Sequence, residues 1–263
     1  MKSENILEVS DLHVRYGAYE AVKGVSFALK RGGILGIVGE SGSGKSTIAK
    51  VLMGLMNPSA GRIQVKVEGE GEQWADSTVR LRSSPNIQMI FQDAVGSLNP
   101  RMTVRQTLEE IIEFKNKQDN RMGRKRSDDS DDSIIRLLTL VGLSAAVLDQ
   151  YPRELSGGQC QRVSIARALA CEPDILVADE PVSALDVSVQ ARVLNLLRDL
   201  RKELGLSILL IAHDLAVVKN VCDEICVMEH GRFVDRGESA AVFERPQSDY
   251  TKKLLAAVPR IVV

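Results

Sequence analysis

Hydrophobic and polar positions alternate along most of the first part of the chain. Residues 6–16 and 23–32 switch between apolar and polar side chains, which is typical of strands with one buried face. Residues 33–39, GILGIVG, instead form an unbroken apolar run that ends in glycine. Such a run predicts a strand that is buried on both faces.

A helical pattern follows the glycine-rich stretch GESGSGKST. In residues 46–56, the apolar residues Ile48, Val51, Leu52 and Leu55 recur at helical spacing and are predicted to share one face. The sequence NPSAG then ends the helix. Further strands are predicted at residues 62–69 and 87–93.

The middle of the chain is helical in character. Residues 103–114 combine an amphipathic pattern with a capping residue, Thr103, and residues 134–143 return to a helical pattern. Between them, residues 115–133 contain almost no apolar side chain, and a basic block precedes an acidic one. We predict a solvated loop there, and the pattern assigns it no role.

The last third of the chain alternates strands with helices. Strands are predicted at residues 174–180, 207–214 and 224–237, and helices at residues 189–205 and 215–223. Strands separated by helices of this kind indicate a mostly parallel sheet that is covered by helices. The sequence therefore predicts an α/β fold with a helical insertion between two strand-containing parts.

Composition narrows the class of protein. At 263 residues the chain is one large domain or two small ones, and its 34 basic and 35 acidic residues disfavour a generic nucleic-acid binder. No apolar run approaches the roughly 20 residues of a membrane helix, and the amino terminus lacks the apolar core of a signal peptide. We therefore expect a cytoplasmic protein that reaches a membrane only through a partner.

The four cysteines do not indicate a metal site. Cys160, Cys171, Cys222 and Cys226 form no C-x-x-C pair. We expect them to be small buried residues in a reducing compartment.

Residues 39–46 have the chemistry of a phosphate cradle. Gly39, Gly44, Lys45 and Ser46 match the pattern G-x-x-x-x-G-K-[ST] between a predicted strand and a predicted helix. Glycines let backbone N–H groups approach phosphate oxygens, and the helix directs its positive end at them. The lysine adds a full charge near the β- and γ-phosphates, and the serine hydroxyl is suited to Mg²⁺.

An acidic pair follows the apolar run ILVA. Asp179 and Glu180 stand at the end of a predicted strand, where the chain can turn and direct both carboxylates at one site. In combination with the phosphate cradle, Asp179 is predicted to hold the metal, and Glu180 to polarise the attacking water.

A second anion site is predicted at LSGGQ. Ser156 stands where a helix begins, so its hydroxyl is expected to cap the helix beside exposed N–H groups. The segment has no cradle lysine. It therefore lacks a ligand in its own chain unless it contacts a phosphate that another chain holds.

The order of GESGSGKST, FQD, LSGGQ, ILVADEP, SALD and IAHD resembles the nucleotide-binding subunits of ATP-binding cassette (ABC) transporters. The resemblance covers residues 6–245, and it implies that two such domains pack head to tail. The residues that it places on the partner's ATP are Ser156, Gly157, Gly158 and Gln159. This arrangement would supply the missing ligand of the second anion site.

The resemblance also implies roles for single residues. It assigns catalysis to Glu180, His213 and Lys45, Mg²⁺ binding to Ser46, Gln92 and Asp179, and the dimer-interface loop to Asp186. It assigns ATP binding to Tyr16, which would stack on adenine, and to Gly39, Glu40, Ser41, Gly42, Ser43, Gly44, Lys45, Ser46, Thr47 and Gln92.

The domain organisation implied by the family has three parts. A P-loop NTPase core with an N-terminal antiparallel β subdomain occupies residues 6–96 and 166–245. An inserted helical subdomain, expected to contact the membrane partner, occupies residues 97–165, and a short tail occupies residues 246–263.

Longer segments narrow the resemblance to one branch of importers. FQDAVGSLNPRMTV, YPRELSGGQ and DYTKKLLAAVPR resemble the oligopeptide/dipeptide/nickel branch, closest to the second of its two ATPases. The implied partners are a second ABC ATPase, either a paralogue or an identical chain, two transmembrane permeases and, indirectly, a solute-binding protein. The implied location is the cytoplasmic face of the inner membrane.

The cargo stays open between peptides, nickel and a related small solute. Many members of the branch continue beyond AAVP into a tail that often contains cysteines, whereas this sequence ends at Val263. Two other functions are compatible with an ABC ATPase. One is an accessory ATPase of a soluble enzyme complex such as a carbon–phosphorus lyase system. The other is a protein that acts on nucleic acid or ribosomes, which the single cassette and lack of a coiled-coil insertion disfavour.

Overall fold

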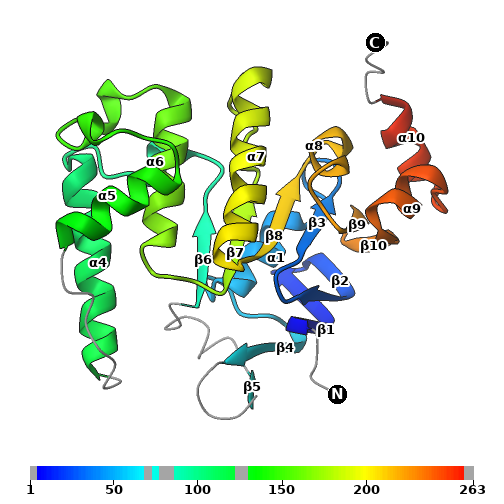
Figure 1. Ribbon diagram of the computed structural model, residues 1–263. Helices are drawn as coiled ribbons and strands as arrows, with labels where there is room; N and C mark the ends of the chain where they lie inside the picture. The colour runs from blue at the N-terminus through cyan, green and yellow to red at the C-terminus, as the bar shows by residue number, and fades with distance from the viewer. Residues whose placement is uncertain (1–4, 68–72, 77–85, 122–129, 258–263) are drawn as a thin grey trace.

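The strands of the chain form two sheets (Figure 1), and the computed structural model describes residues 5–67, 73–76, 86–121 and 130–257. The first sheet is antiparallel, with strand order β2-β1-β4-β5. Its strands are β1 (Asn5–Tyr16), β2 (Tyr19–Lys30), β4 (Ala60–Val67) and β5 (Gln73–Asp76).

The second sheet is mostly parallel and has the order β10-β9-β3-β8-β7-β6. Its strands are β3 (Ile34–Val38), β6 (Ile87–Ile90), β7 (Ile175–Asp179), β8 (Ser207–Ala212), β9 (Glu224–Glu229) and β10 (Arg232–Glu238). Only the β9–β10 pair is antiparallel among the described pairings of this sheet. The predicted α/β fold with an antiparallel N-terminal part is confirmed.

The parallel strands are buried on both faces because each separates two hydrophobic cores. In β3, Leu35 and Ile37 pack toward the antiparallel sheet, whereas Ile34 and Val38 pack toward helices on the opposite face. This two-sided burial explains the unbroken apolar run of the sequence.

The helices divide into those that cover the sheets and those that form a separate group. They are α1 (Lys45–Leu52), α3 (Ala94–Ser97), α4 (Val104–Arg121), α5 (Ser130–Leu140), α6 (Gly157–Leu169), α7 (Val187–Leu204), α8 (Leu215–Lys219), α9 (Ser239–Glu244) and α10 (Asp249–Ala257), with 3-10 turns at Ala145–Val147 and Pro152–Glu154. Figure 1 shows α4, α5 and α6 gathered at one end of the molecule and α9 and α10 at the other. The predicted cap of α4 is confirmed, because Thr103 Oγ1 accepts a hydrogen bond from the Gln106 N–H.

The predicted loop at residues 115–133 is wrong at both ends. Helix α4 continues to Arg121 and α5 begins at Ser130, while residues 122–129 lie outside the described part of the chain. Lys, Gln and Arg are good helix formers, and two contacts support the extension of α4. Lys117 pairs with Glu113 one turn away, and the largely buried Lys115 pairs with Glu172.

Two further details differ from the sequence prediction. Helix α1 ends at Leu52 and Gly54 takes a positive φ of 65°, so Leu55 leaves the buried face and is 65% exposed. The single strand predicted at residues 224–237 is a hairpin, since His230 and Gly231 both have positive φ and reverse the chain. The pattern also did not predict β5.

The C-terminal helices pack onto the sheet that carries β9 and β10. Thr251 is fully buried, and the partly buried Tyr250, Leu254 and Leu255 of α10 contact the larger core. Among the described helices, none combines the length and apolar character that crossing a membrane requires.

Candidate nucleotide site

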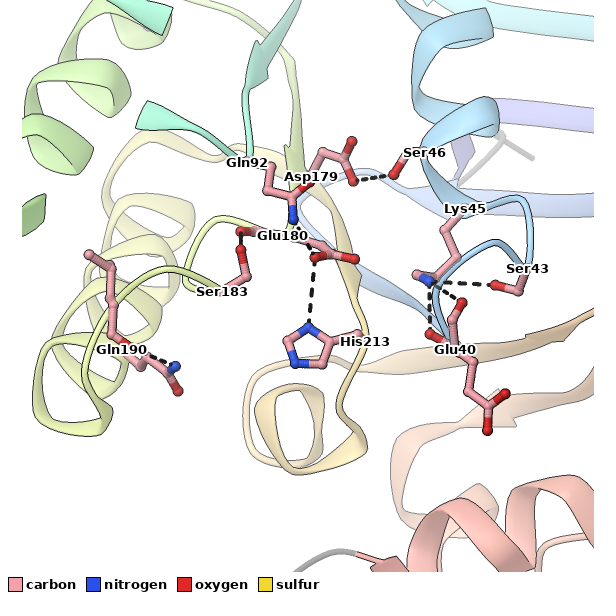
Figure 2. A network of polar contacts seen from close by, with 12 residues as sticks. Glu40, Ser43, Lys45, Ser46, Gln92, Asp179, Glu180, Ser183, Gln190 and His213 are labelled. Atoms are coloured by element: carbon pink, nitrogen blue, oxygen red, sulfur yellow. Dashed lines mark hydrogen bonds and ion pairs between the residues drawn. The ribbon is translucent and has the colours of Figure 1, made fainter. Parts of the chain in front are cut away.

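Four parallel strands end at one edge of the large sheet, and each carries a predicted site residue. The chain leaves β3 into the glycine-rich loop, β6 toward Gln92, β7 at Asp179 and Glu180, and β8 at His213. The carboxyl ends of neighbouring parallel strands lie side by side, which is where ligands of open α/β sheets bind. Figure 2 shows these side chains directed toward a common region.

The backbone of the glycine-rich loop leaves no room for side chains at two positions. A Cβ at Gly39 would lie 2.1 Å from the carbonyl oxygen of Met228. Gly44 has a φ of 113°, and a Cβ there would lie 2.5 Å from the carbonyl oxygen of Ala21. Because Gly44 is the N-cap of α1 and has no side chain, the first N–H groups of that helix stay open to an anion.

Lys45 is held inside the loop that it follows. Its ammonium group donates hydrogen bonds to the carbonyl oxygens of Gly39 at 2.7 Å and Glu40 at 2.8 Å. The residue is 3% exposed. Burial lowers the pKa of the amine, and the nearby carboxylates of Glu180 and Asp179 oppose this shift. A buried cation with these partners is suited to binding an additional anionic group.

Asp179 and Ser46 form a compact pair of oxygen ligands. The Ser46 hydroxyl donates to Asp179 Oδ1 at 3.1 Å, and Asp179 is 6% exposed. Burial raises the pKa of the carboxyl group, although the serine hydrogen bond and Lys45 favour its ionised form. Folding therefore places a carboxylate in an environment that disfavours its charge.

We predict that Asp179→Asn stabilises the nucleotide-free protein. A carboxyl group whose pKa rises on folding stabilises the native state below its ordinary pKa and loses that contribution as pH rises through the folded value. At neutral pH the neutral amide avoids this cost and still accepts the Ser46 hydrogen bond. Differential scanning fluorimetry should show a Tm higher by a few degrees, on the order expected for about 1 kcal/mol.

A comparison of the wild type and Asp179→Asn at several pH values provides the control for this prediction. The Tm difference between Asp179→Asn and the wild type should narrow as pH is lowered, because the wild-type carboxyl group then becomes protonated. An Asp179→Asn protein that is less stable than wild type at neutral pH would contradict the assignment of burial as the dominant cause.

Glu180 lies at the centre of a small polar network. Its backbone has a φ of 46°, an uncommon conformation for a residue other than glycine, and its side chain is 14% exposed. Gln92 Nε2 donates to Glu180 Oε2 at 2.9 Å, and His213 Nδ1 lies 3.7 Å from the same oxygen. Strained backbone that brings a carboxylate beside a histidine is frequent at functional sites.

A cavity of about 580 Å³ joins the loop to this network. Its walls include Tyr16, Glu40, Ser41, Gly42, Gly44, Lys45, Ser46, Thr47, Gln92, Glu180 and His213. Most predicted site residues therefore meet at one cavity. Gly39 and Ser43 lie within the loop but do not line it, and Asp179 lines the neighbouring groove instead.

Two aromatic residues stand at the rim of the cavity. Tyr16 is 45% exposed, and its hydroxyl lies 3.4 Å from Thr47 Oγ1. Tyr19 pairs with Tyr16 across the β1–β2 hairpin and also lines the cavity, although the sequence prediction missed it. The sequence YGAY could have indicated this position, because a two-residue turn at Gly17 and Ala18 places its flanking residues Tyr16 and Tyr19 side by side.

The segment Ser156–Gln159 and Asp186 do not line this cavity. Ser156 Oγ accepts from the Gln159 N–H and Gln159 Oε1 accepts from the Ser156 N–H, so the predicted cap of α6 is confirmed. Asp186 caps α7 by accepting from the Val189 N–H at 3.0 Å. A hydrogen bond from the Ser188 hydroxyl is the main reason that the pKa of Asp186 is lowered.

The cysteines are buried thiols. Burial raises the pKa of Cys160, Cys171 and Cys222 and brings that of Cys226 to about 12. In the part of the chain that the structure describes, no three His, Cys, Asp or Glu residues group closely enough to hold a metal.

The fold and the loop between β3 and α1 define an ATPase of the P-loop class. A family model described as ABC transporter matches residues 22–183. The oligopeptide transport ATP-binding protein OppF of Lactococcus lactis is 44% identical over 271 residues, which cover 98% of this chain and 82% of that protein. The chain belongs to the ABC transporter family, which confirms the resemblance found in the sequence.

Solved structures agree with this assignment. The structure of cbiO1 from Clostridium perfringens, described as part of the ABC transporter complex cbiONQ, has a TM-score of 0.76 and 29% identity, covering 98% of both chains. A dimeric structure of the ATP-binding cassette MJ0796 bound to ADP and Pi has a TM-score of 0.71 and 26% identity, covering 89% of this chain and 98% of that one. The chain is therefore an ABC ATPase, whose activity is ATP hydrolysis coupled to transport.

Proposed function

We propose that the chain is the ATPase subunit of a membrane importer for oligopeptides. The assignment of oligopeptides as the cargo rests on the 44% identity to OppF, which extends over 98% of this chain. The proposal favours peptides over nickel or another solute. Two permeases, which a solute-binding protein supplies with cargo, would complete the importer, and nucleic acid has no part in it.

The proposed binding mode places the triphosphate of ATP on residues 39–47. The backbone N–H groups of the loop and of the start of α1 would bind phosphate oxygens, and Lys45 would exchange its carbonyl partners for the β- and γ-phosphates. Tyr16, at the rim of the cavity, would stack on adenine.

The oxygen ligands at the site fit Mg²⁺. Mg²⁺ is commonly bound by one or two carboxylates together with substrate phosphates, and Ser46 and Asp179 already lie in contact. We propose Ser46, Asp179 and Gln92 as the residues that hold it. Bound Mg²⁺ would neutralise charge on the phosphates, and the low exposure of Asp179 would keep water from competing for that carboxylate.

Glu180 is the proposed base for the attacking water. Its carboxylate is held by Gln92 and lies next to His213, so both neighbours fix its direction toward the cavity. His213 would contact the γ-phosphate. Hydrolysis of phosphoric anhydrides depends mainly on positioning and charge stabilisation, which this rigid arrangement supplies.

A second ABC ATPase would close the site through Ser156, Gly157, Gly158 and Gln159. A Cβ at Gly158 would lie 2.8 Å from Val189 Cγ1, so the chain's own packing accounts for that glycine. A Cβ at Gly157 would meet only Leu185, at an ordinary 3.6 Å. The fold itself therefore does not require glycine at residue 157, whereas close approach of a partner's nucleotide would. Asp186, near this segment, would lie in the interface loop.

The groove beside the nucleotide cavity is the proposed permease contact. It has a volume of about 960 Å³ and is lined by Leu55, Phe91, Gln92 and parts of the helices α3, α4 and α6. Leu55 and Phe91 are 65% and 39% exposed, so two large apolar side chains reach solvent in one groove, as at protein interaction sites. We propose that residues 97–165, as the helical subdomain, form one side of this contact at the cytoplasmic face of the membrane, and that Leu55 and Phe91 form the other.

Lys45→Ala tests the nucleotide site. Removing a charge-assisted contact to phosphate should weaken ATP binding by about 10- to 100-fold. Isothermal titration with ATP and Mg²⁺ measures the effect. Lys202→Ala, which removes an exposed lysine from the last turn of α7, is the matched control and should bind normally. Unchanged affinity in Lys45→Ala would contradict the proposed cradle.

A further inference from the structure

The C-terminal helix α10 reaches the nucleotide loop from a distant part of the sequence. The Tyr250 hydroxyl accepts a hydrogen bond of 2.9 Å from the backbone N–H of Glu40, a residue 210 positions earlier. In Figure 2 the red C-terminal helices lie on the side of the loop where Glu40 is drawn. Glu40 lines the cavity but Tyr250 does not, so Tyr250 supports the loop from behind and is not part of the ATP-binding surface.

The position of Tyr250 is fixed by the fold. The carboxylate of Asp235 in β10 is 7% exposed and accepts hydrogen bonds from the N–H groups of Gln247 and Ser248, just before α10. The Ser248 hydroxyl then accepts from the N–H groups of Tyr250 and Thr251 and so caps the helix. The start of α10 is therefore anchored to the sheet.

The residue whose N–H Tyr250 contacts also supports Lys45. The carbonyl oxygen of Glu40 accepts one hydrogen bond from Lys45 Nζ at 2.8 Å and another from the Ser43 N–H at 3.2 Å. Residue 40 is thus held at its N–H by α10 and at its carbonyl by the loop itself. From outside the loop and α1, the described backbone hydrogen bonds to residues 39–44 are this one, at the Glu40 N–H, and one from the Gly231 N–H to the carbonyl oxygen of Ser43 at 2.9 Å.

We propose that Tyr250 is a positioning residue that holds the nucleotide loop in its binding conformation and so sets the affinity for ATP and ADP. The proposal rests on the function proposed for residues 39–47. A loop that is already ordered loses less conformational entropy when it binds phosphate.

Tyr250→Phe tests this role because it removes the hydroxyl and keeps the ring that packs on the core. One neutral hydrogen bond predicts a loss of affinity of about two- to tenfold for ADP with Mg²⁺, measured by isothermal titration. The KM for ATP should rise by the same factor with kcat unchanged, since the loop is held equally for substrate and transition state. The Tm without nucleotide should fall by no more than a few degrees, the change that loss of one hydrogen bond of about 1 kcal/mol allows.

The controls separate this proposal from the function on which it rests. Lys252→Ala removes an exposed residue of α10 whose described partner, Asp249, lies on the same helix, and it should leave affinity unchanged. Normal ADP affinity in Tyr250→Phe, with affinity lost in Lys45→Ala, would overturn the role of Tyr250 and leave the nucleotide site standing. Normal affinity in Lys45→Ala would instead overturn the site itself.

Discussion

Glu180→Gln is expected to lower ATP turnover by about 100- to 10,000-fold, the range that a positioned general base contributes. The amide keeps the size of the side chain and its contact with Gln92, but it has no negative charge with which to accept a proton from water. Because Lys45 and the loop glycines are untouched, ATP should bind as tightly as before. With hydrolysis blocked, the ATP-bound dimer should accumulate.

Phosphate release and light scattering measure the two parts of this prediction. Scattering should show an ATP-dependent dimer for Glu180→Gln that disperses when ATP is removed. Glu203→Gln, an exposed change of the same chemistry in α7, should turn over ATP at the wild-type rate. Normal turnover by Glu180→Gln would show that another group activates the water.

Gly157→Asp is expected to abolish turnover without weakening ATP binding by the single chain. The chain's own structure leaves ordinary space at this position, and an acidic residue in the first turn of a helix is favourable. The Tm should therefore stay near the wild-type value. In a closed dimer, however, the new carboxylate would face the phosphates held by the partner, and like-charge repulsion would prevent closure.

Two other variants distinguish the effect of the added charge at residue 157 from an effect on the chain's own packing. Gly157→Asn has nearly the size of the aspartate variant without its charge, and it should retain more activity. Gly158→Ala should instead lower the Tm, because its Cβ collides with Val189 of the same chain. A fully active Gly157→Asp protein would contradict the proposed position of this segment on the partner's ATP.

Local rules made most of the nucleotide site predictable from the sequence. The apolar strand, the glycines and the following helix identify the loop between β3 and α1 by themselves, and parallel strand ends bring Asp179, Glu180 and His213 to the same edge. The cap at Ser156 is equally local, because its hydrogen bonds span three residues. The roles of Tyr16, Gln92, Asp186 and His213 came from the family resemblance, since none of these residues has a local pattern that assigns it a role.

Other features depend on backbone conformation or on distant contacts. Leu55 has the spacing of a buried residue, yet the positive φ of Gly54 ends the helix before it. The hairpin at His230 was missed because few residues other than glycine take positive φ, and here His230 does so together with Gly231. The contact between Tyr250 and Glu40 joins elements 210 residues apart, which no local pattern predicts.

The claim that ATP is hydrolysed only between two subunits is tested most directly by turnover per chain as the protein is diluted under saturating ATP. Light scattering at each concentration gives the fraction of monomer. We predict that turnover per chain falls toward zero as the chain becomes monomeric, and that it returns when more chain or its partner ATPase is added. Constant turnover per chain down to a fully monomeric sample would contradict the account.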